Sequence, residues 1–273
     1  MPELPEVETV RRGLAPRLVG VTLESVWTSG KPLRMNHPLD VRGLRRTLGE
    51  VAAVERRAKY LILTVAGRSI VVHLGMTGRL EIAPRAAERE PHTHVVWSLS
   101  SGADLRYVDV RRFGAILCAA DPAQLPEIEL LGEDPLSRRF TPARLAELAA
   151  GRKRNAKTFL LDQTRVAGLG NIYVCEALHH ARIHPEARVD RLDLSRITAL
   201  HRAIQDVLRK AVANRGTTLR DYRDSSGQPG ENQLTLQAYG REGEPCPRGD
   251  GQIRRVVIQG RSTFFCPACQ RRS

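Results

Sequence analysis

The chain has 273 residues, 41% of them hydrophobic, which suits two modest domains with their own cores and excludes extensive disorder. No apolar run is long enough to span a bilayer and no basic-then-apolar leader opens the chain, so we expect a cytoplasmic protein without a membrane partner. The net charge of +13 is uneven: residues 1–150 hold 21 basic and 18 acidic side chains and residues 151–273 hold 22 and 12, which favours a polyanionic partner.

The first part of the chain has the pattern of one helix followed by short strands. Apolar residues at helical spacing predict a helix over residues 5–18. Runs rich in β-forming residues predict strands at 21–27, 60–65, 69–74, 94–99, 105–110 and 115–119. Many short strands without helices between them are typical of an antiparallel sandwich or barrel. We therefore predict an N-terminal β domain over residues 1–131.

After about residue 130 the pattern becomes helical. Capping residues and apolar spacing predict helices that begin after Thr141, at residue 155, after Gly170-Asn171 and at Ser195 as the cap. Residues 214–233 are rich in Gly, Ser, Asp and Asn and are expected to form a mobile loop. The prediction is an α+β multidomain chain, with a helical domain over 132–235 and a cysteine-bearing hairpin over 236–273.

The N-terminus offers a nucleophile. The chain opens Met1-Pro2-Glu3, and a small second residue favours removal of the initiator methionine, which leaves Pro2 as a secondary amine that titrates near ~8. Such an amine can attack a sugar C1′, expel the base and leave an iminium. Glu3 is close enough in sequence to transfer protons. The structural alternative is that Pro and Glu are favoured in the first turn of any helix.

Motifs spread along the chain resemble those of the formamidopyrimidine-DNA glycosylases. In family order they are Pro2-Glu3-Leu4-Pro5-Glu6, Arg56-Arg57-Ala58-Lys59-Tyr60-Leu61, His73-Leu74-Gly75-Met76-Thr77-Gly78, Arg111-Arg112-Phe113-Gly114, Gly168-Leu169-Gly170-Asn171-Ile172-Tyr173 and Tyr239-Gly240-Arg241. Several motifs in order are far more specific than any one of them. The resemblance implies an N-terminal antiparallel β-sandwich, a helix–two-turn–helix domain and a C-terminal zinc-finger-like β-hairpin. It also implies a monomeric glycosylase and lyase that acts on double-stranded DNA.

The resemblance assigns catalytic roles to four residues. Pro2 would form the Schiff base and Glu3 would be the proton donor. Lys59 matches the family's lysine for β-elimination, and Arg261 matches the finger arginine that contacts phosphate and is assigned to δ-elimination. Without the resemblance, Lys59 would be interpreted as a surface lysine.

Other residues match positions that hold the DNA. A glycosylase takes its target base out of the stack, and Met76, Arg111 and Phe113 match the residues that fill the resulting void. A flexible apolar wedge, a planar cation and an aromatic ring suit that task. The alternative is that Met76 and Phe113 are ordinary core residues at strand ends. The remaining family DNA contacts match His92, Lys153, Lys157 and Asn171.

The terminal cysteines depart from a four-cysteine zinc ribbon. Cys266 and Cys269 form an intact Cys-x-x-Cys pair, but Cys246 is followed by Gly249 where the family has cysteine. Cys246, Cys266 and Cys269 could still hold zinc, with reduced affinity, if water or a carboxylate such as Asp250 completed the tetrahedron. Alternatively, the hairpin folds without metal.

The other cysteines and histidines are interpreted as structural. Cys118 and Cys175 lie in apolar stretches and are expected to be inert buried thiols. His179, His180 and His184 are expected to be helix-face and loop residues rather than metal ligands.

The expected reaction is excision of 8-oxoguanine and formamidopyrimidines from duplex DNA, followed by β- and δ-elimination without a redox cofactor or a catalytic metal. A first alternative is the endonuclease VIII type, which favours oxidised pyrimidines; that group tends to open Pro-Glu-Gly-Pro, so Leu4 argues against it. A second is a non-catalytic protein that binds damaged DNA.

Residues 214–233 are expected to cover the everted base, although Glu231-Asn232 stands where the family often has aromatics.

Overall fold

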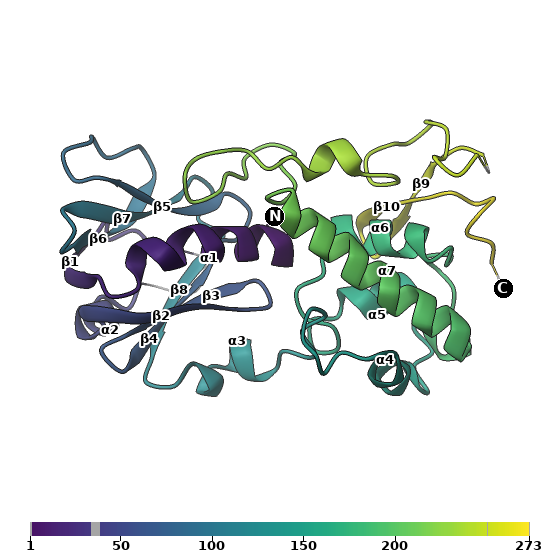
Figure 1. Ribbon diagram of the computed structural model, residues 1–273, viewed down its shortest axis with the longest axis horizontal. Coiled ribbons are helices and arrows are strands. Elements are labelled where there is room, and N and C mark those ends of the chain that lie inside the picture. Colours follow the sequence, from purple (N-terminus) through teal and green to yellow (C-terminus); the bar gives the residue numbers. More distant parts are fainter. Residues whose placement is uncertain (1, 34–38, 250, 273) are drawn as a thin grey trace. The chain divides into compact units, whose positions relative to one another are not determined.

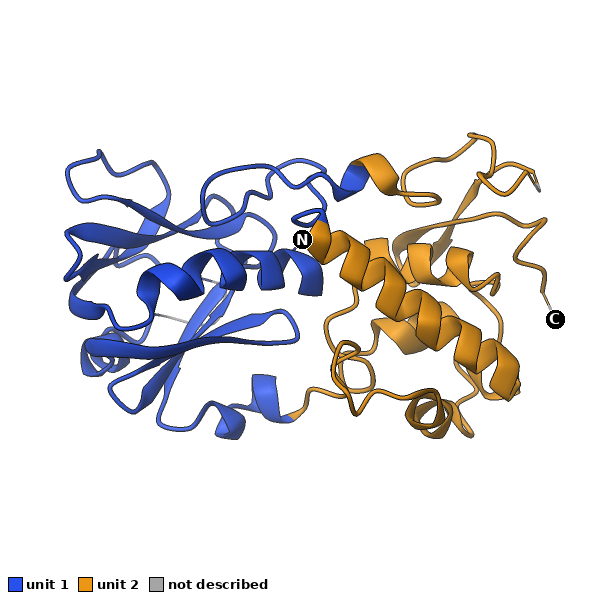
Figure 2. Ribbon diagram, viewed as in Figure 1, with its two compact units in different colours: residues 1–129, 214–233 blue, residues 130–213, 234–273 orange. Residues whose placement is uncertain are grey.

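The computed structural model describes residues 2–33, 39–249 and 251–272. The chain forms two compact units, coloured separately in Figure 2: residues 1–129 with 214–233, and residues 130–213 with 234–273. The segment 214–233, predicted as part of the helical domain, therefore belongs to the first unit. These units group residues by proximity, and the division into three domains along the chain stays a prediction. None of the described helices is both long enough and apolar enough to cross a membrane.

The first unit contains an antiparallel sheet with the strand order β5-β7-β6-β1-β2-β3-β4-β8. Its strands are β1 (Thr22–Thr28), β2 (Gly49–Arg57), β3 (Tyr60–Val65), β4 (Arg68–His73), β5 (Gly78–Pro84), β6 (Thr93–Leu99), β7 (Ala103–Asp109) and β8 (Ala115–Ala119). Strands β1 and β2 pair only at Thr22–Glu50 and Leu23–Gly49 among the described residues. The sheet divides at this short pairing into two halves, which Figure 1 shows above and below helix α1 in that view. This is the predicted antiparallel β-sandwich.

Helix α1 (Leu4–Leu18) confirms the predicted N-terminal helix. Its buried apolar residues Val7, Val10, Leu14 and Leu18 recur at intervals of three and four, so they line one face. That face joins the main core, in which β-strand residues such as Trp97 are also buried. The elements of this unit that were not predicted include α2 (Val41–Arg46), β2 and β5. In β2 the consecutive charged residues Glu55, Arg56 and Arg57 interrupt the alternation of a strand, whereas Arg79-Leu80-Glu81-Ile82 of β5 does alternate over four residues and was an available signal.

The second unit contains the predicted helices. They are α4 (Pro142–Ala149), α5 (Ala156–Leu161), α6 (Asn171–His180) and α7 (Leu194–Ala213). Thr141 caps α4 through its side chain, as predicted, and Asn155 caps α5. The prediction of Ser195 as the cap of α7 was wrong. The helix begins at Leu194, and Asp193 Oδ1 accepts the backbone N–H of Arg196 at 2.8 Å, so Asp193 takes the capping role.

The chain ends in a two-stranded hairpin, as predicted. Strands β9 (Arg254–Ile258) and β10 (Arg261–Phe265) pair antiparallel, and Ile258 faces Arg261 across a two-residue turn. Gln259 and Gly260 have φ values of 49° and 68°, the positive pair that a type I′ turn needs. The remaining short elements are α3 (Pro126–Glu129) and the 3₁₀ segments η1 (Pro122–Gln124), η2 (Val189–Arg191) and η3 (Asn232–Thr235).

Candidate functional site

The predicted nucleophile precedes the first turn of α1. Pro2 is buried, and Glu3, the N-cap residue, is 3% exposed. Glu3 and Glu6 form a capping box: the Glu3 side chain accepts the Glu6 backbone N–H, and Glu6 Oε2 accepts the Glu3 N–H at 2.8 Å. The Glu3 carboxylate is therefore held at the positive end of the helix dipole, one residue from Pro2.

Glu6 also ties the start of α1 to the 214–233 segment. Its Oε1 accepts the backbone N–H of Thr217 at 2.7 Å, and its carbonyl oxygen accepts the hydroxyl of Tyr222 at 3.3 Å. Burial, together with the Glu6 charge, raises the pKa of Tyr222 far above its usual value, so the hydroxyl stays protonated. Asn232, buried where the family often has an aromatic residue, donates to Thr217 Oγ1 at 2.9 Å. The segment predicted to cover the base is thus anchored beside the predicted nucleophile.

Lys59 lies in the tight turn between β2 and β3. Arg57 and Tyr60 pair across this turn, and Ala58 has a φ of 52°. Lys59 is 7% exposed, so the interpretation as a surface lysine is wrong. The end of β2 is fixed on α1 because Glu8 accepts from Arg56 at 3.2 Å.

Glu8 gathers three arginines around one carboxylate. It accepts from Arg11 and Arg12 on its own helix as well as from Arg56. Burial acts to raise the pKa of Glu8, but the hydrogen bonds from Arg11 and Arg12 and the nearby charges outweigh it and lower the pKa to about 2.

The three predicted void-filling residues lie on two loops. Met76 is in the loop between β4 and β5, and Arg111 and Phe113 are in the loop between β7 and β8. Met76 is 39% exposed and Phe113 is 37% exposed, so neither is a core residue and that alternative is wrong. The guanidinium carbon of Arg111 lies 4.5 Å from the centre of the Phe113 ring, in a cation–π contact.

A buried carboxylate joins these two loops. Asp109 is fully buried; its Oδ1 accepts from Thr77 Oγ1 at 2.6 Å, and its Oδ2 accepts from Tyr107 Oη at 3.1 Å and from the Gly114 N–H at 2.9 Å. Thr77 Oγ1 in turn accepts the Arg111 N–H at 3.1 Å. Residues 74–78 and 109–114 therefore form one hydrogen-bonded unit, called the loop platform below.

Gly75 allows the two loops of the platform to pack against each other. Its φ is 63°, and a Cβ at this position would lie 2.4 Å from the backbone nitrogen of Gly114 and 2.4 Å from the carbonyl carbon of Phe113. Any other residue would separate the loops, because backbone atoms cannot yield at that distance.

A basic cleft of about 540 Å³ lies in the first unit beside the platform. Its lining includes His92 and Arg111, predicted to contact DNA, and also Arg79, Arg220 and Arg223. Arg79 forms ion pairs with Glu81 and Glu90, so part of the positive charge is balanced locally. The cleft suits an anionic ligand.

In the second unit, Lys157 and Asn171 hold the terminal hairpin. The Lys157 ammonium donates to the carbonyl oxygen of Ser262 at 3.1 Å and also to Thr263 Oγ1, and Asn171 Nδ2 donates to the same carbonyl oxygen at 2.8 Å. Lys157 is fully buried, and this desolvation lowers its pKa. Arg261 is exposed next to the hairpin turn. Lys157 and Asn171 thus position the strand that presents Arg261, and their own contact with DNA stays a prediction.

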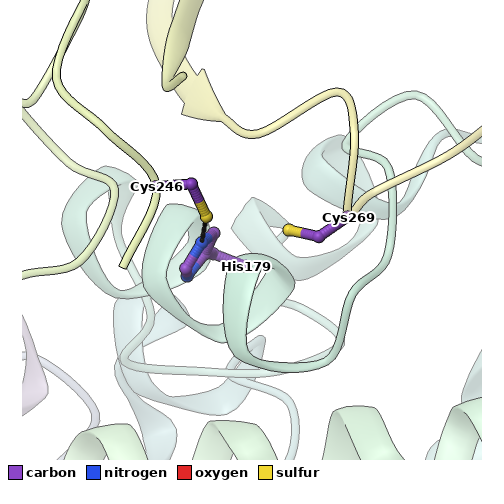
Figure 3. A group of neighbouring side chains, drawn as sticks. All are labelled: His179, Cys246 and Cys269. Carbon is purple, nitrogen blue, oxygen red and sulfur yellow. Dashed lines mark hydrogen bonds between the residues drawn. The ribbon is translucent and has the colours of Figure 1, made fainter. Parts of the chain in front are cut away.

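A cluster of potential metal ligands combines one helix residue with two cysteines on separate loops (Figure 3). One donor atom each from His179, Cys246 and Cys269 lies within 4.8 Å of the others, and His179 Nε2 is 3.3 Å from Cys246 Sγ. Cys266 is fully buried and packs in the same cluster as Cys246 and Cys269, although its thiol lies outside the group within 4.8 Å. Thiolates and imidazole are the ligands that zinc prefers. Asp250, considered above as a ligand, lies outside the described residues.

The interpretation of His179 as a plain helix-face residue was wrong. It is fully buried and faces the cysteines, whereas the half-buried His180 and the loop residue His184 are outside the cluster. Sequence reasoning also missed Glu176, whose carboxylate accepts the backbone N–H groups of Gln237, Ala238 and Tyr239 at 2.8 Å each. The available signal was a set of polar residues inside an otherwise apolar helix.

Comparison with known proteins places these features in a family. Residues 1–116 match the model of the formamidopyrimidine-DNA glycosylase N-terminal domain, residues 131–223 its H2TH domain, and residues 243–272 the zinc finger found in FPG and IleRS. The zinc-finger match and the cysteine–histidine cluster indicate a structural zinc site.

Relatives match over almost the whole chain. The formamidopyrimidine-DNA glycosylase of Geobacillus kaustophilus is 43% identical, with 99% of this chain and 100% of the relative covered. The protein of the same name from Phenylobacterium zucineum is 46% identical at the same coverage. A point mutant of Lactococcus lactis FPG, solved with DNA that contains Fapy-dG, has a TM-score of 0.90 and 36% identity, and the match covers 99% of this chain and 100% of the mutant. A wild-type Lactococcus lactis complex with DNA that contains an oxidised pyrimidine has a TM-score of 0.89 at the same identity and coverage.

Proposed function

Because the chain belongs to the formamidopyrimidine-DNA glycosylase family and is a DNA glycosylase for oxidised bases, we propose that it is bifunctional. It removes 8-oxoguanine and formamidopyrimidines from double-stranded DNA and then cleaves the strand at the abasic site. The observation that carries this proposal is the N-terminal pair: Pro2 and Glu3 are buried at the start of α1, with the Glu3 carboxylate held by the capping box.

The proposed chemistry begins with the Pro2 nitrogen, which becomes the free N-terminal amine when Met1 is removed. Its lone pair forms a bond to C1′ as the bond from C1′ to the base breaks, and the proton lost by the amine goes to the departing base. The C1′–O4′ bond then breaks while Glu3 donates a proton to O4′, which leaves an open-chain iminium between Pro2 and C1′. The resulting iminium acidifies the C2′ proton, and loss of that proton expels the 3′ phosphate. Lys59 is the base proposed for this β-elimination, and its burial in the β2–β3 turn supports a functional place for it. Arg261 binds phosphate for the subsequent δ-elimination.

The loop platform is proposed to stabilise the everted state of the substrate. Met76, Arg111 and Phe113 fill the space that the damaged base leaves, because the platform presents all three side chains to solvent on a rigid hydrogen-bonded support. His92, Lys153 and Asn171 are the remaining residues proposed to contact DNA, whereas Lys157, matched to a DNA-contacting position, is fully buried and acts by positioning the hairpin. Residues 214–233 cover the base. The protein acts as a monomer in the bacterial cytoplasm.

One structural zinc per chain is proposed in the terminal module, with Cys246, Cys266 and Cys269 among its ligands. Bound zinc would crosslink the two cysteine-bearing turns and so stabilise the hairpin that carries Arg261. The proposed chemistry at Pro2 needs no metal.

Oxidised pyrimidines are the second candidate substrate class. The specific observation is that a structural relative was solved with DNA containing such a lesion. A protein that binds damage without catalysis is a third possibility, against which the buried Pro2, Glu3 and Lys59 argue.

Borohydride trapping on a duplex with 8-oxoguanine opposite cytosine tests the proposal. We expect a covalent protein–DNA adduct with the wild type and with Pro5→Ala, a matched control in the same helical turn, and loss or strong reduction of the adduct with Pro2→Gly. A wild type that binds the duplex without forming an adduct would contradict it. Parallel duplexes with an oxidised pyrimidine or an abasic site then separate a different lesion preference from a lack of catalysis.

A further inference from the structure

We propose that His179, on helix α6 and outside the terminal module, is the fourth ligand of the zinc site and replaces the cysteine absent at position 249. The inference deepens the zinc part of the proposed function. It concerns the identity of one ligand and is independent of the chemistry at Pro2.

The distances fit a tetrahedral centre. Zinc–sulfur bonds of about 2.3 Å and zinc–nitrogen bonds of about 2.0–2.1 Å require ligand atoms roughly 3.5–3.8 Å apart. His179 Nε2 lies 3.3 Å from Cys246 Sγ, and the donor atoms of His179, Cys246 and Cys269 all lie within 4.8 Å of one another. Cys266, which is fully buried next to these cysteines, provides the remaining donor; its thiol is not part of the group within 4.8 Å and has to rotate toward it. Small side-chain rotations are therefore enough to enclose an ion.

The imidazole presents the correct atom from a fixed backbone. Cys175, Glu176 and His179 lie within one turn of α6, and i and i+4 side chains share a helix face. Cys175 belongs to the apolar cluster with Cys246 and Cys266, while Glu176 accepts three consecutive backbone N–H groups at the start of the terminal module, residues 236–273. The face of α6 that carries His179 is therefore packed on the module independently of any metal.

Both cysteine-bearing turns are also fastened next to the end of α6. An Arg248 amino group donates to the carbonyl oxygen of His180 at 2.9 Å, which holds the turn that follows Cys246. Gln270 Oε1 accepts the Cys266 N–H at 2.8 Å, and its Nε2 donates to the carbonyl oxygen of Ile183 at 2.8 Å. These bonds place the cysteines around His179 from two sides.

Position 249 offers no side chain that could bind a metal. Gly249 has a φ of 77° and closes the turn by donating its N–H to the Cys246 carbonyl oxygen at 2.9 Å, with nothing within 4 Å of where a Cβ would lie. Three cysteines and one histidine from this chain form a full tetrahedral set without water. On binding, the three thiols release their protons, and neutral His179 coordinates through Nε2.

Metal content and ligand spectroscopy on the full chain test the proposal. Zinc is measured per chain after dialysis against a chelator of moderate affinity, for wild type, His179→Ala and His180→Gln, the matched control one residue along α6. We expect about one zinc per chain for wild type and His180→Gln, and an affinity at least about 100-fold weaker for His179→Ala. In the cobalt-substituted protein, His179→Cys should keep tetrahedral ligand-field bands with a stronger thiolate charge-transfer band.

A measurement on the wild type alone covers the case in which His179→Ala fails to fold. X-ray absorption at the zinc edge should show three sulfur ligands and one nitrogen ligand with the outer-shell scattering of an imidazole. Three sulfurs with a water or carboxylate oxygen, equal zinc affinity in His179→Ala and wild type, or a wild type that binds no zinc would each overturn the proposal. Borohydride trapping by Pro2, measured in parallel, reports on the proposed function separately.

Discussion

The loop platform and the terminal hairpin both present residues proposed to contact DNA, but they are supported differently. The platform is held by Asp109, Thr77 and Gly114, which belong to the same loops and adjoining strands, and the main core lies behind it. The hairpin is held from α5 and α6, by contacts that span 91 to 106 residues of chain. Four of the five residues of β9 are exposed. The platform is thus self-supporting, whereas the hairpin depends on polar and apolar contacts with distant helices and on its proposed metal.

The largest effect is expected from Asp109→Ala. This change leaves three donors without their buried acceptor, and we expect a loss of about 3 kcal/mol in the free energy of unfolding of the first unit. Thr77→Val removes one of these hydrogen bonds and should cost about 1 kcal/mol. Urea unfolding followed by the fluorescence of Trp97, buried in this unit, measures both. Equal stability of Asp109→Ala and wild type would show that the platform is supported by packing alone.

The corresponding change in the hairpin is Lys157→Met. Loss of the buried ammonium leaves the Ser262 carbonyl oxygen and Thr263 Oγ1 short of a donor, and should destabilise the hairpin by about 2 kcal/mol while the first unit keeps its stability. Hydrogen exchange of the amides in β9 and β10 measures this. The control is Lys153→Met, an exposed lysine, which should leave exchange unchanged. Equal exchange rates in all three proteins would contradict the positioning role of Lys157.

A third change tests whether an exposed residue of the platform contributes to DNA binding without contributing to folding stability. Phe113→Ala removes a ring that is 37% exposed, so stability should change little, while affinity for a duplex with an abasic site should fall by about 1–3 kcal/mol through lost stacking. Val110→Ala, at a more exposed position of the same platform, is the control and should bind normally. Fluorescence anisotropy at constant salt measures the binding. Weak binding by both variants would indicate general damage to the platform.

The smallest effect concerns Glu8, which links α1 to β2. Its pKa is lowered to about 2 in the folded chain, below its ordinary value of 4.5. The contribution of Glu8 to the free energy of unfolding is therefore complete at a pH above the pKa of this group in the unfolded chain. It is lost as the pH falls from about 5 through 2. The amount should be about 1 kcal/mol, less than the pKa shift alone implies, because Arg11 and Arg12 are partly exposed and solvent screens their charges. Glu8→Gln should flatten the pH dependence of the melting temperature over this range, and an unchanged slope would show that other carboxylates dominate.

Strict periodicity made much of the fold predictable. The apolar spacing of α1 and the continuous apolar run of β3 determined both element type and position, since each buries a face of fixed period. Strand β2 escaped prediction because Glu55, Arg56 and Arg57 follow one another and break the alternation, and β5 because its alternation covers only residues 79–82. The packing of residues 214–233 with the first unit depends on the Thr217–Glu6 bond, which joins residues far apart in sequence and leaves no local pattern.

Some site residues could be predicted from a local motif, whereas others depend on contacts between distant parts of the chain. Motif residues such as Met76 and Phe113 could be named from sequence, but whether they were core or exposed could not, because exposure depends on loops folded by Asp109. His179 had no motif around it. Its place among the cysteines arises only when α6 packs on a module that lies 67 residues further along the chain.

The residues that hold the terminal hairpin all precede it in the sequence, and this order affects how the protein folds during synthesis. Lys157, Asn171, Glu176 and His179 are all synthesised before the hairpin that they hold. At bacterial elongation rates of about 5–20 residues per second, α6 is complete several seconds before the C-terminal residues emerge. The hairpin therefore meets an assembled docking face as it leaves the exit tunnel. Binding of the proposed zinc ion, rather than helix formation, is then the last step in the folding of the chain.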